Sequence, residues 1–147
     1  MGDLKIGIRN ISDNPSPVYA TPGSSGLDVR AWLEEPITLG SLERYMVPTG
    51  LYIEIPAGYE AQMRPRSGLA LKQGLTCLNS PGTIDSDYRG ELKVILVNLS
   101  NEAQTIHPGD RIAQLVFQKV EKIEWVEKAT LSDTHRGEGG FGHTGKH

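Results

Sequence analysis

The sequence predicts an all-β sandwich or barrel of short strands with one short helix. Seventeen glycines and nine prolines are spread along the 147 residues, so turns are frequent and the elements between them are short. Several of these elements alternate apolar and polar residues, which is the period of a half-buried strand. The length fits one domain, which buries roughly 70% of the surface that its unfolded chain would expose.

The first two strands are expected near the N-terminus. Apolar residues alternate over residues 4–8, and the prolines of residues 15–22 then keep the chain out of a central strand. The next strand has one apolar and one charged face, formed by Leu27, Val29 and Ala31 and by Asp28 and Arg30. On this segment alone, the simplest interpretation of the charged face is a solvated ion pair.

Further strands are expected at residues 37–39, 43–47, 51–55, 59–63, 112–117 and 120–126. Turn residues separate the first four of them at Pro36, Gly40, Pro48-Thr49-Gly50 and Pro56-Ala57-Gly58. Gln114 lies among apolar residues of its strand, so it needs a hydrogen-bond partner if it is buried. Trp125 of the last strand is expected to pack in the core or in a subunit contact.

One short helix is expected at residues 65–74, with Ser67 as its N-cap and Gly74 just past its end. Arg66 beside the helix start leaves two interpretations open. The start binds an anion, because unpaired N–H groups and the helix dipole both favour negative charge. Alternatively, Ser67 only caps the helix and Arg66 is solvated.

Residues 79–98 are the expected place of the chemistry. This segment is predicted to be a hairpin, with a Pro-Gly arm, a polar turn around Tyr88 and a β-branched return strand that ends at Asn98. Asp85 follows Ile84, so on an extended arm the two side chains point in opposite directions. Asp85 is therefore free to face a cleft.

Composition limits the possible partners and compartments. With a net charge of −3 and a pI of about 5.8, the whole molecule does not attract nucleic acid, so any anion site is local. Cys77 is the only cysteine, which excludes an internal disulfide and a Cys-based zinc site and favours an inert buried thiol. The longest wholly apolar run, residues 94–97, is too short to span a bilayer, and the N-terminus lacks a signal-peptide core. We expect a soluble, cytoplasmic protein that binds neither nucleic acid nor membrane.

The C-terminal segment changes character, with five glycines and one aromatic residue, Phe141, in residues 136–147. Its composition is typical of a disordered tail. The alternative is a flexible arm whose backbone N–H groups wrap phosphate while Phe141 covers a ring. Both remain open at this point.

Five segments, each weak alone, occur in one order and together resemble the five motifs of the trimeric dUTPases, the deoxyuridine triphosphate nucleotidohydrolases. They are Ser25-Gly26-Leu27-Asp28-Val29-Arg30-Ala31, Pro65-Arg66-Ser67-Gly68-Leu69-Ala70, Gly82-Thr83-Ile84-Asp85-Ser86-Asp87-Tyr88-Arg89-Gly90, Gly109-Asp110-Arg111-Ile112-Ala113-Gln114 and Arg136-Gly137-Glu138-Gly139-Gly140-Phe141-Gly142. The resemblance runs from about residue 4 to residue 145. Ser25 stands where alanine is frequent, which affects no catalytic position.

This resemblance implies a jelly-roll-like β-barrel at residues 1–132 and a flexible glycine-rich arm at residues 133–147 that closes over an active site. It also implies a homotrimer with active sites at the subunit boundaries. The reaction would convert dUTP and water into dUMP and pyrophosphate, with Mg²⁺ bound mainly by the triphosphate. Such an enzyme keeps uracil out of DNA and supplies dUMP for thymidylate synthesis. A carboxylate base, a metal-neutralised triphosphate, cationic clamps and a lid suit anhydride hydrolysis.

The third motif would supply the base-recognition and catalytic residues. By this match, Asp85 is the general base that activates the water attacking the α-phosphorus. Tyr88 would pack against the deoxyribose and leave no room for a 2′-hydroxyl. The uracil edge would be read by a side chain and three main-chain segments: Asn79, Thr83, Ile84 and Lys93.

The other motifs would supply the phosphate and lid residues. Arg66, Ser67 and Gly68 of the second motif would hold the phosphates at the helix start, and Gln114 of the fourth would face them too. Asp28 of the first would act through water on the hydrated metal or its neighbouring cation. The fifth motif would close over the nucleotide of a neighbouring subunit with Arg136, Phe141 and Gly142.

Two other functions fit the same fold. A dCTP deaminase shares parts of the second and third motifs, but the position of its proton-carrying glutamate is Ile95 here, and an alkyl group cannot move a proton. A non-catalytic nucleotide-binding regulator is expected to have lost Asp85, Tyr88 or the arm with Phe141. This chain keeps all three.

Overall fold

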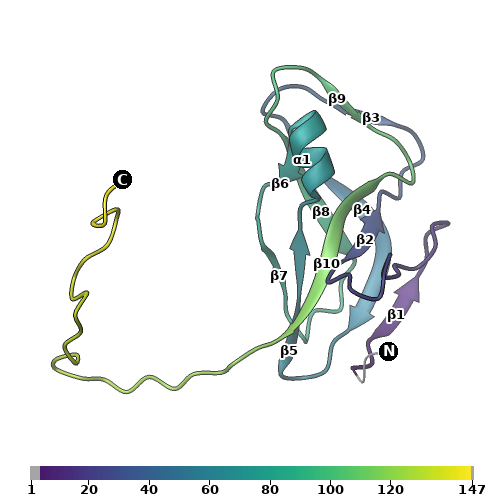
Figure 1. Ribbon diagram of the computed structural model, residues 1–147. Helices are drawn as coiled ribbons and strands as arrows, with labels where there is room; N and C mark the ends of the chain where they lie inside the picture. The colour runs from purple at the N-terminus through teal and green to yellow at the C-terminus, as the bar shows by residue number, and fades with distance from the viewer. Residues whose placement is uncertain (1–3, 147) are drawn as a thin grey trace.

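Two four-stranded antiparallel sheets form the body of the protein in the computed structural model, which describes residues 4–146 (Figure 1). Sheet A has the strand order β1-β4-β8-β6, sheet B has β2-β10-β5-β7, and β3 pairs with β9. The strands are β1 (Gly7–Asn10), β2 (Leu27–Arg30), β3 (Ile37–Leu39), β4 (Arg44–Glu54), β5 (Tyr59–Arg64), β6 (Leu75–Cys77), β7 (Gly82–Ile84), β8 (Leu92–Asn98), β9 (Gln104–Ile106) and β10 (Arg111–Lys119). The helix α1 (Ser67–Gln73) lies between β5 and β6.

The core lies between the inner faces of the two sheets. Leu92, Val94 and Leu96 of β8 are buried, and so are Val29 of β2 and Ala31 just after it. Their alternation with exposed or half-buried residues follows from the period of two in an extended strand. Burying this apolar surface is the main favourable term in folding, and the predicted inward face of the β2 segment is confirmed.

The prediction of mostly β structure with one short helix is confirmed, but the sheets do not close into a barrel. Each four-stranded sheet keeps two edge strands, β1 and β6 in sheet A and β2 and β7 in sheet B. The strand expected at residues 120–126 is also wrong: β10 ends at Lys119, and the chain then runs away from the sheets (Figure 1). Trp125 is 87% exposed, so within this chain it does not pack in the core.

The two strands expected at residues 43–47 and 51–55 are one strand, β4, with an irregularity where a turn was predicted. Gly50 has a φ of 72°, and the pairing of β4 with β8 shifts register there. The Thr49 hydroxyl donates to the Leu92 carbonyl, and the Gly50 N–H donates to the Glu91 carboxylate over 3.1 Å. Pro48-Thr49-Gly50 is therefore a β-bulge within one strand and not a turn between two strands. The hydrogen bonds to Leu92 and Glu91 satisfy backbone groups that the bulge removes from the ladder.

Helix α1 has its N-cap one residue earlier than the predicted Ser67. Arg66, in an extended conformation, is the N-cap, and no side chain caps the helix, so the assignment of Ser67 as N-cap is wrong. The strand β5 delivers the chain in this extended conformation up to Arg66. Gly74 ends the helix with a left-handed φ of 65°, as predicted. No helix within residues 4–146 has the length and apolar character needed to cross a bilayer.

Cys77 of β6 is buried in the core, and burial raises the pKa of its thiol from 9.0 to about 11. The thiolate is therefore disfavoured in the folded protein, which fits the predicted inert thiol.

This pKa difference predicts a loss of stability at alkaline pH. The unfolded chain releases the Cys77 proton near pH 9.0, whereas the folded chain holds it until about pH 11, so the free energy of unfolding falls across this window. Two pKa units correspond to at most about 2.7 kcal/mol. Urea unfolding of the wild type and of Cys77→Ala should show a smaller alkaline loss in the variant, whatever its stability at neutral pH. Equal losses would contradict the assignment.

Candidate active site

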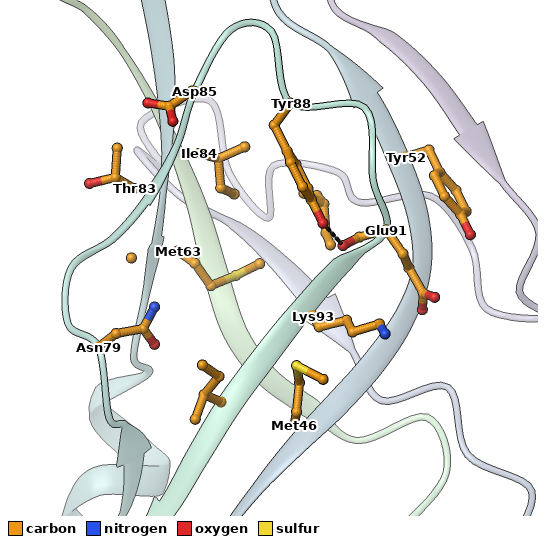
Figure 2. Close-up of a pocket in the computed structure, with 13 residues that line it drawn as sticks. Met46, Tyr52, Met63, Asn79, Thr83, Ile84, Asp85, Tyr88, Glu91 and Lys93 are labelled. Atoms are coloured by element: carbon orange, nitrogen blue, oxygen red, sulfur yellow. Dashed lines mark hydrogen bonds between the residues drawn. The ribbon is translucent and has the colours of Figure 1, made fainter.

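A pocket of about 520 Å³ lies between β7, β8 and the loop that joins them (Figure 2). Its walls include six of the residues predicted to bind the nucleoside part of the substrate: Asn79, Thr83, Ile84, Asp85, Tyr88 and Lys93. The structure thus brings the whole predicted base and sugar set together within one chain.

The two strands beside this pocket are not the paired hairpin that the sequence predicts. β7 pairs with β5 in sheet B, whereas β8 pairs with β4 and β6 in sheet A. The loop between them crosses from one sheet to the other, because each arm buries its apolar side chains in the core by joining a different sheet. The space between the diverging arms is the pocket.

The divergence directs backbone groups of β8 toward the pocket. The Leu78 N–H donates to the Ile95 carbonyl over 2.9 Å, so the backbone groups of Ile95 point toward β6. Backbone groups two residues apart on a strand point the same way, so those of Lys93 share this direction. Since β6 ends at Cys77, no strand of the described chain pairs with Lys93 on that side.

The end of β7 presents the predicted carboxylate. Ile84 is 9% exposed and packs in the core, whereas Asp85 is exposed, so their side chains point in opposite directions as predicted. Figure 2 shows Thr83 and Asp85 on one side of the strand and Ile84 on the other. An exposed carboxylate at the pocket wall is accessible to both water and a ligand.

Tyr88 forms the opposite wall of the pocket. Its phenol donates a hydrogen bond of 2.8 Å to the main-chain carbonyl of Glu91 (Figure 2). The Glu91 side chain in turn accepts the N–H of Gly50 in the β4 bulge. The ring is thus tied to the start of β8, and that start is tied to β4.

A second polar cluster surrounds the start of α1. Asp28 accepts from Arg66 Nε at 3.0 Å and from an Arg111 terminal nitrogen at 3.4 Å. Gln114 donates to the Pro65 carbonyl over 3.0 Å, which is the partner that its half-buried position requires. The predicted solvated pair of Asp28 and Arg30 is therefore wrong: Asp28 pairs with Arg66 and Arg111, whereas Arg30 donates to the Gly109 carbonyl.

The pocket and this cluster lie apart in one chain. Asp28 lies on β2 and Asp85 follows β7, and these strands are the two edges of sheet B. Three inter-strand spacings separate them by about 14 Å. Along the strand direction, Asp85 follows Ile84, which pairs with Ala61 of β5. Arg64, at the end of β5 that leads into the helix, lies about 10 Å from Ala61 along this strand.

The remaining predicted residues lie at the start of α1 and on the C-terminal segment. Ser67 and Gly68 are exposed and directly follow Arg66 of the second cluster. Arg136, Phe141 and Gly142 are exposed on the C-terminal segment, which extends away from the sheets (Figure 1). In this chain the C-terminal segment therefore lies away from both the pocket and the cluster.

Three contributors were not singled out from the sequence. Arg111 lies in the fourth motif three residues before Gln114, which was the available clue. Met63 lines the pocket from β5, although its pattern indicated only a core residue. The role of Glu91 could not be predicted from the sequence, because its carboxylate accepts the Gly50 N–H of the β4 bulge, which the sequence did not predict.

Within residues 4–146, no three His, Cys, Asp or Glu side chains gather into a metal-binding group. Asp28 is the one carboxylate within the second cluster, and two arginines contact it. Mg²⁺ usually keeps several waters and binds one or two carboxylates together with substrate phosphates. The residues present thus fit a metal ion that arrives with a phosphate ligand and not one held by the protein alone.

Comparison with known proteins identifies the family of the chain. The model of the dUTPase family matches residues 12–145. The deoxyuridine 5′-triphosphate nucleotidohydrolase of Fusobacterium nucleatum is 67% identical over 130 residues, which cover 88% of this chain and 89% of that protein. The enzyme of the same name from Finegoldia magna is 59% identical over 142 residues, covering 97% and 99%.

The fold has solved counterparts. A mutant dUTPase of Staphylococcus bacteriophage 80alpha, solved with dUpNHpp, superposes with a TM-score of 0.83 at 24% identity and covers 96% of this chain and 98% of its own. The dUTPase of phage phi11 of S. aureus reaches a TM-score of 0.75 at 22% identity, over 88% of this chain. The matched family model spans nearly the whole sequence and the relatives share most of its residues. The chain therefore belongs to the dUTPase family.

Proposed function

We propose that the protein hydrolyses dUTP to dUMP and pyrophosphate with Mg²⁺. The observation that carries this proposal is the pocket between β7 and β8, where an accessible carboxylate, an aromatic wall and unpaired backbone groups meet. The names of relatives at 59% and 67% identity support the same reaction. Removing dUTP keeps uracil out of DNA, and its product dUMP feeds thymidylate synthesis.

Uracil recognition uses the diverging arms. The backbone of Lys93 faces the gap, and β7 is an edge strand, so every second residue of β7 also turns its backbone groups away from the sheet. One of the adjacent residues Thr83 and Ile84 turns its backbone groups outward in this way, and the Asn79 amide adds both a donor and an acceptor. A pyrimidine edge with two carbonyls and one N–H is complementary to such a set, because buried polar groups require partners.

Tyr88 and Asp85 act on the sugar and on the water. The Tyr88 ring packs against the deoxyribose, and the space it fills excludes a 2′-hydroxyl. Asp85 accepts a proton from the water that attacks the α-phosphorus, which requires the carboxylate to lie within hydrogen-bond reach of that water. The exposure of Asp85 at the pocket wall supports this role.

The triphosphate binds the cluster at the start of α1. Arg66 and Gln114 face the phosphates, together with Ser67 and Gly68, whose backbone N–H groups lie in the first helical turn. Asp28 orients Arg66 and reaches the hydrated metal through water. Bound Mg²⁺ neutralises phosphate charge.

A complete site then needs two chains. Within one chain, Asp85 follows one edge strand of sheet B and Asp28 of the Arg66 cluster lies on the other, three inter-strand spacings or about 14 Å away. We infer a homotrimer in which the pocket of one subunit meets the cluster of another. Arg136, Phe141 and Gly142 of the extended C-terminal segment close over the nucleotide of a neighbour, with the Phe141 ring over the base.

The substrate assignment predicts a clear order of activities. Pyrophosphate release from dUTP, dCTP, dTTP and UTP is measured in parallel with Mg²⁺ and, as a control, with excess EDTA. We expect dUTP to be preferred over each competitor by about 10²-fold or more, because a pocket built to hydrogen-bond one edge leaves its polar groups unpaired with another. Equal rates for dUTP and UTP, or ammonia release from dCTP, would contradict the assignment.

The shared site predicts a trimer in solution. Light scattering coupled to size exclusion should give about three times the 16.1 kDa mass of the chain at working concentration. A mass near 16.1 kDa together with full dUTP turnover would contradict shared sites.

A further inference from the structure

We propose that Gly90 is a positioning residue for Tyr88 and thereby sets the discrimination between deoxyribose and ribose. This inference rests on the proposed function, in which the Tyr88 ring occupies the place of a 2′-hydroxyl. Gly90 does not contact the nucleotide in this scheme. Because Gly90 has no side chain, the Tyr88 ring can lie against the Gly90 backbone.

The Tyr88 ring lies close against the backbone of Gly90. A Cβ atom on Gly90 would lie 2.6 Å from Tyr88 Cζ and 2.9 Å from Cε1, and it would also meet the phenol oxygen. Contacts under 3.0 Å to a Cβ are essentially never tolerated, so any side chain at this position displaces the ring. Two ring atoms and the phenol oxygen are affected, so rotating the hydroxyl hydrogen does not relieve the overlap.

A hydrogen bond to the backbone also fixes the far end of the Tyr88 ring. The phenol donates to the Glu91 carbonyl over 2.8 Å, so the residue after Gly90 holds the far end of the ring (Figure 2). Glu91 in turn accepts the Gly50 N–H through its carboxylate, which limits how far this segment yields. The ring itself is 45% exposed. Under steric pressure the ring therefore moves outward toward solvent, while the anchored backbone stays.

An outward shift of the ring opens the space at the sugar. The ring that excludes a 2′-hydroxyl would then lie further from the sugar, so kcat/KM for UTP would rise relative to kcat/KM for dUTP. Discrimination by shape is worth about 10–200-fold per small group. A variant at Gly90 should therefore lose selectivity more than it loses dUTP turnover.

The test compares kcat/KM for dUTP and for UTP in the trimeric holoenzyme with Mg²⁺. Gly90→Ala should lower the dUTP-to-UTP ratio by about tenfold or more. Gly23→Ala is the matched control, because an added Cβ there meets nothing within 4 Å, and it should leave the ratio at the wild-type value. A Gly90→Ala enzyme with the wild-type ratio would overturn the inference, whereas a wild type without dUTP hydrolysis would overturn the proposed function instead.

A double-mutant cycle separates positioning from general damage to the loop. In a Tyr88→Ala background the ring is absent, so adding Gly90→Ala should leave the ratio unchanged. A further fall of the ratio in that background would show that Gly90 acts independently of Tyr88 and would overturn the inference. If Gly90→Ala alone does not fold, the double variant decides: restored folding supports the clash with the ring, and continued unfolding contradicts it.

Discussion

The Asp85→Asn variant should bind dUTP with nearly unchanged affinity and lose turnover by about 10²–10⁴-fold. The amide keeps the shape and exposure of the side chain at the end of β7, but it cannot accept the proton of the attacking water. A fall of kcat at constant dissociation constant is the expected pattern when a group acts only in the transition state.

Asp87→Asn is the matched control for this prediction. Asp87 is also exposed and lies two residues further along the same loop, but it does not line the pocket between β7 and β8. We expect it to retain wild-type kcat within about twofold. Calorimetric titration with a non-hydrolysable dUTP analogue supplies the affinities. An Asp85→Asn enzyme within a factor of about two of the wild type would remove Asp85 from the role of general base.

Truncation after Ser132 should suppress hydrolysis by about 10²-fold or more while leaving the trimer folded. Every strand and helix of the described chain ends by Lys119, so the deletion removes no element of the sheets. It removes Arg136, the glycine amides and Phe141, which we propose as phosphate clamps and as a cover that excludes water. Removing a single preorganised donor at a site of developing charge typically costs about 10²–10³-fold.

The ordering cost of this segment predicts that it becomes ordered only with a ligand bound. Fixing a backbone residue costs roughly 1–2 kcal/mol, and glycine loses the most freedom. A non-hydrolysable dUTP analogue with Mg²⁺ should therefore raise the melting temperature of the full chain more than that of the truncated one. Wild-type turnover after truncation would show the arm to be dispensable, and loss of the trimer would show it to be structural.

Local patterns in the sequence predict most of the strands correctly. β3, β5 and the burial of Val29 and Ala31 follow from alternation and turn residues, and the end of α1 follows from Gly74. These features depend on neighbours along the chain, which a sequence displays directly.

The errors concern relations between distant segments. A hairpin and a crossing between two sheets have the same local pattern at residues 79–98, and only the partners β5, β4 and β6 distinguish them. The Pro48-Thr49-Gly50 bulge looks like a turn until Glu91 and Leu92 satisfy its backbone. Residues 120–126 have a strand pattern but pair with no strand among residues 4–146.

The candidate site shows the same division. The six predicted residues of the pocket all lie between positions 79 and 93, so a motif could predict that they meet, whereas Met46, Tyr52 and Met63 come from more distant strands. The pairing of Asp28 with Arg66 and Arg111 joins three motifs through sheet B, and alternation along one strand cannot reveal it.

We propose that the pocket of one subunit and the Arg66 cluster of another form one active site. Mixing Asp85→Asn and Arg66→Ala subunits tests it most directly, by refolding an equal mixture and assaying pyrophosphate release from dUTP. Each variant alone should be inactive, whereas randomly mixed trimers should recover about a quarter of wild-type activity, because some sites combine an intact Asp85 with an intact Arg66 from a neighbour. A mixture no more active than its two parents would place both residues in a site of one chain and contradict the account.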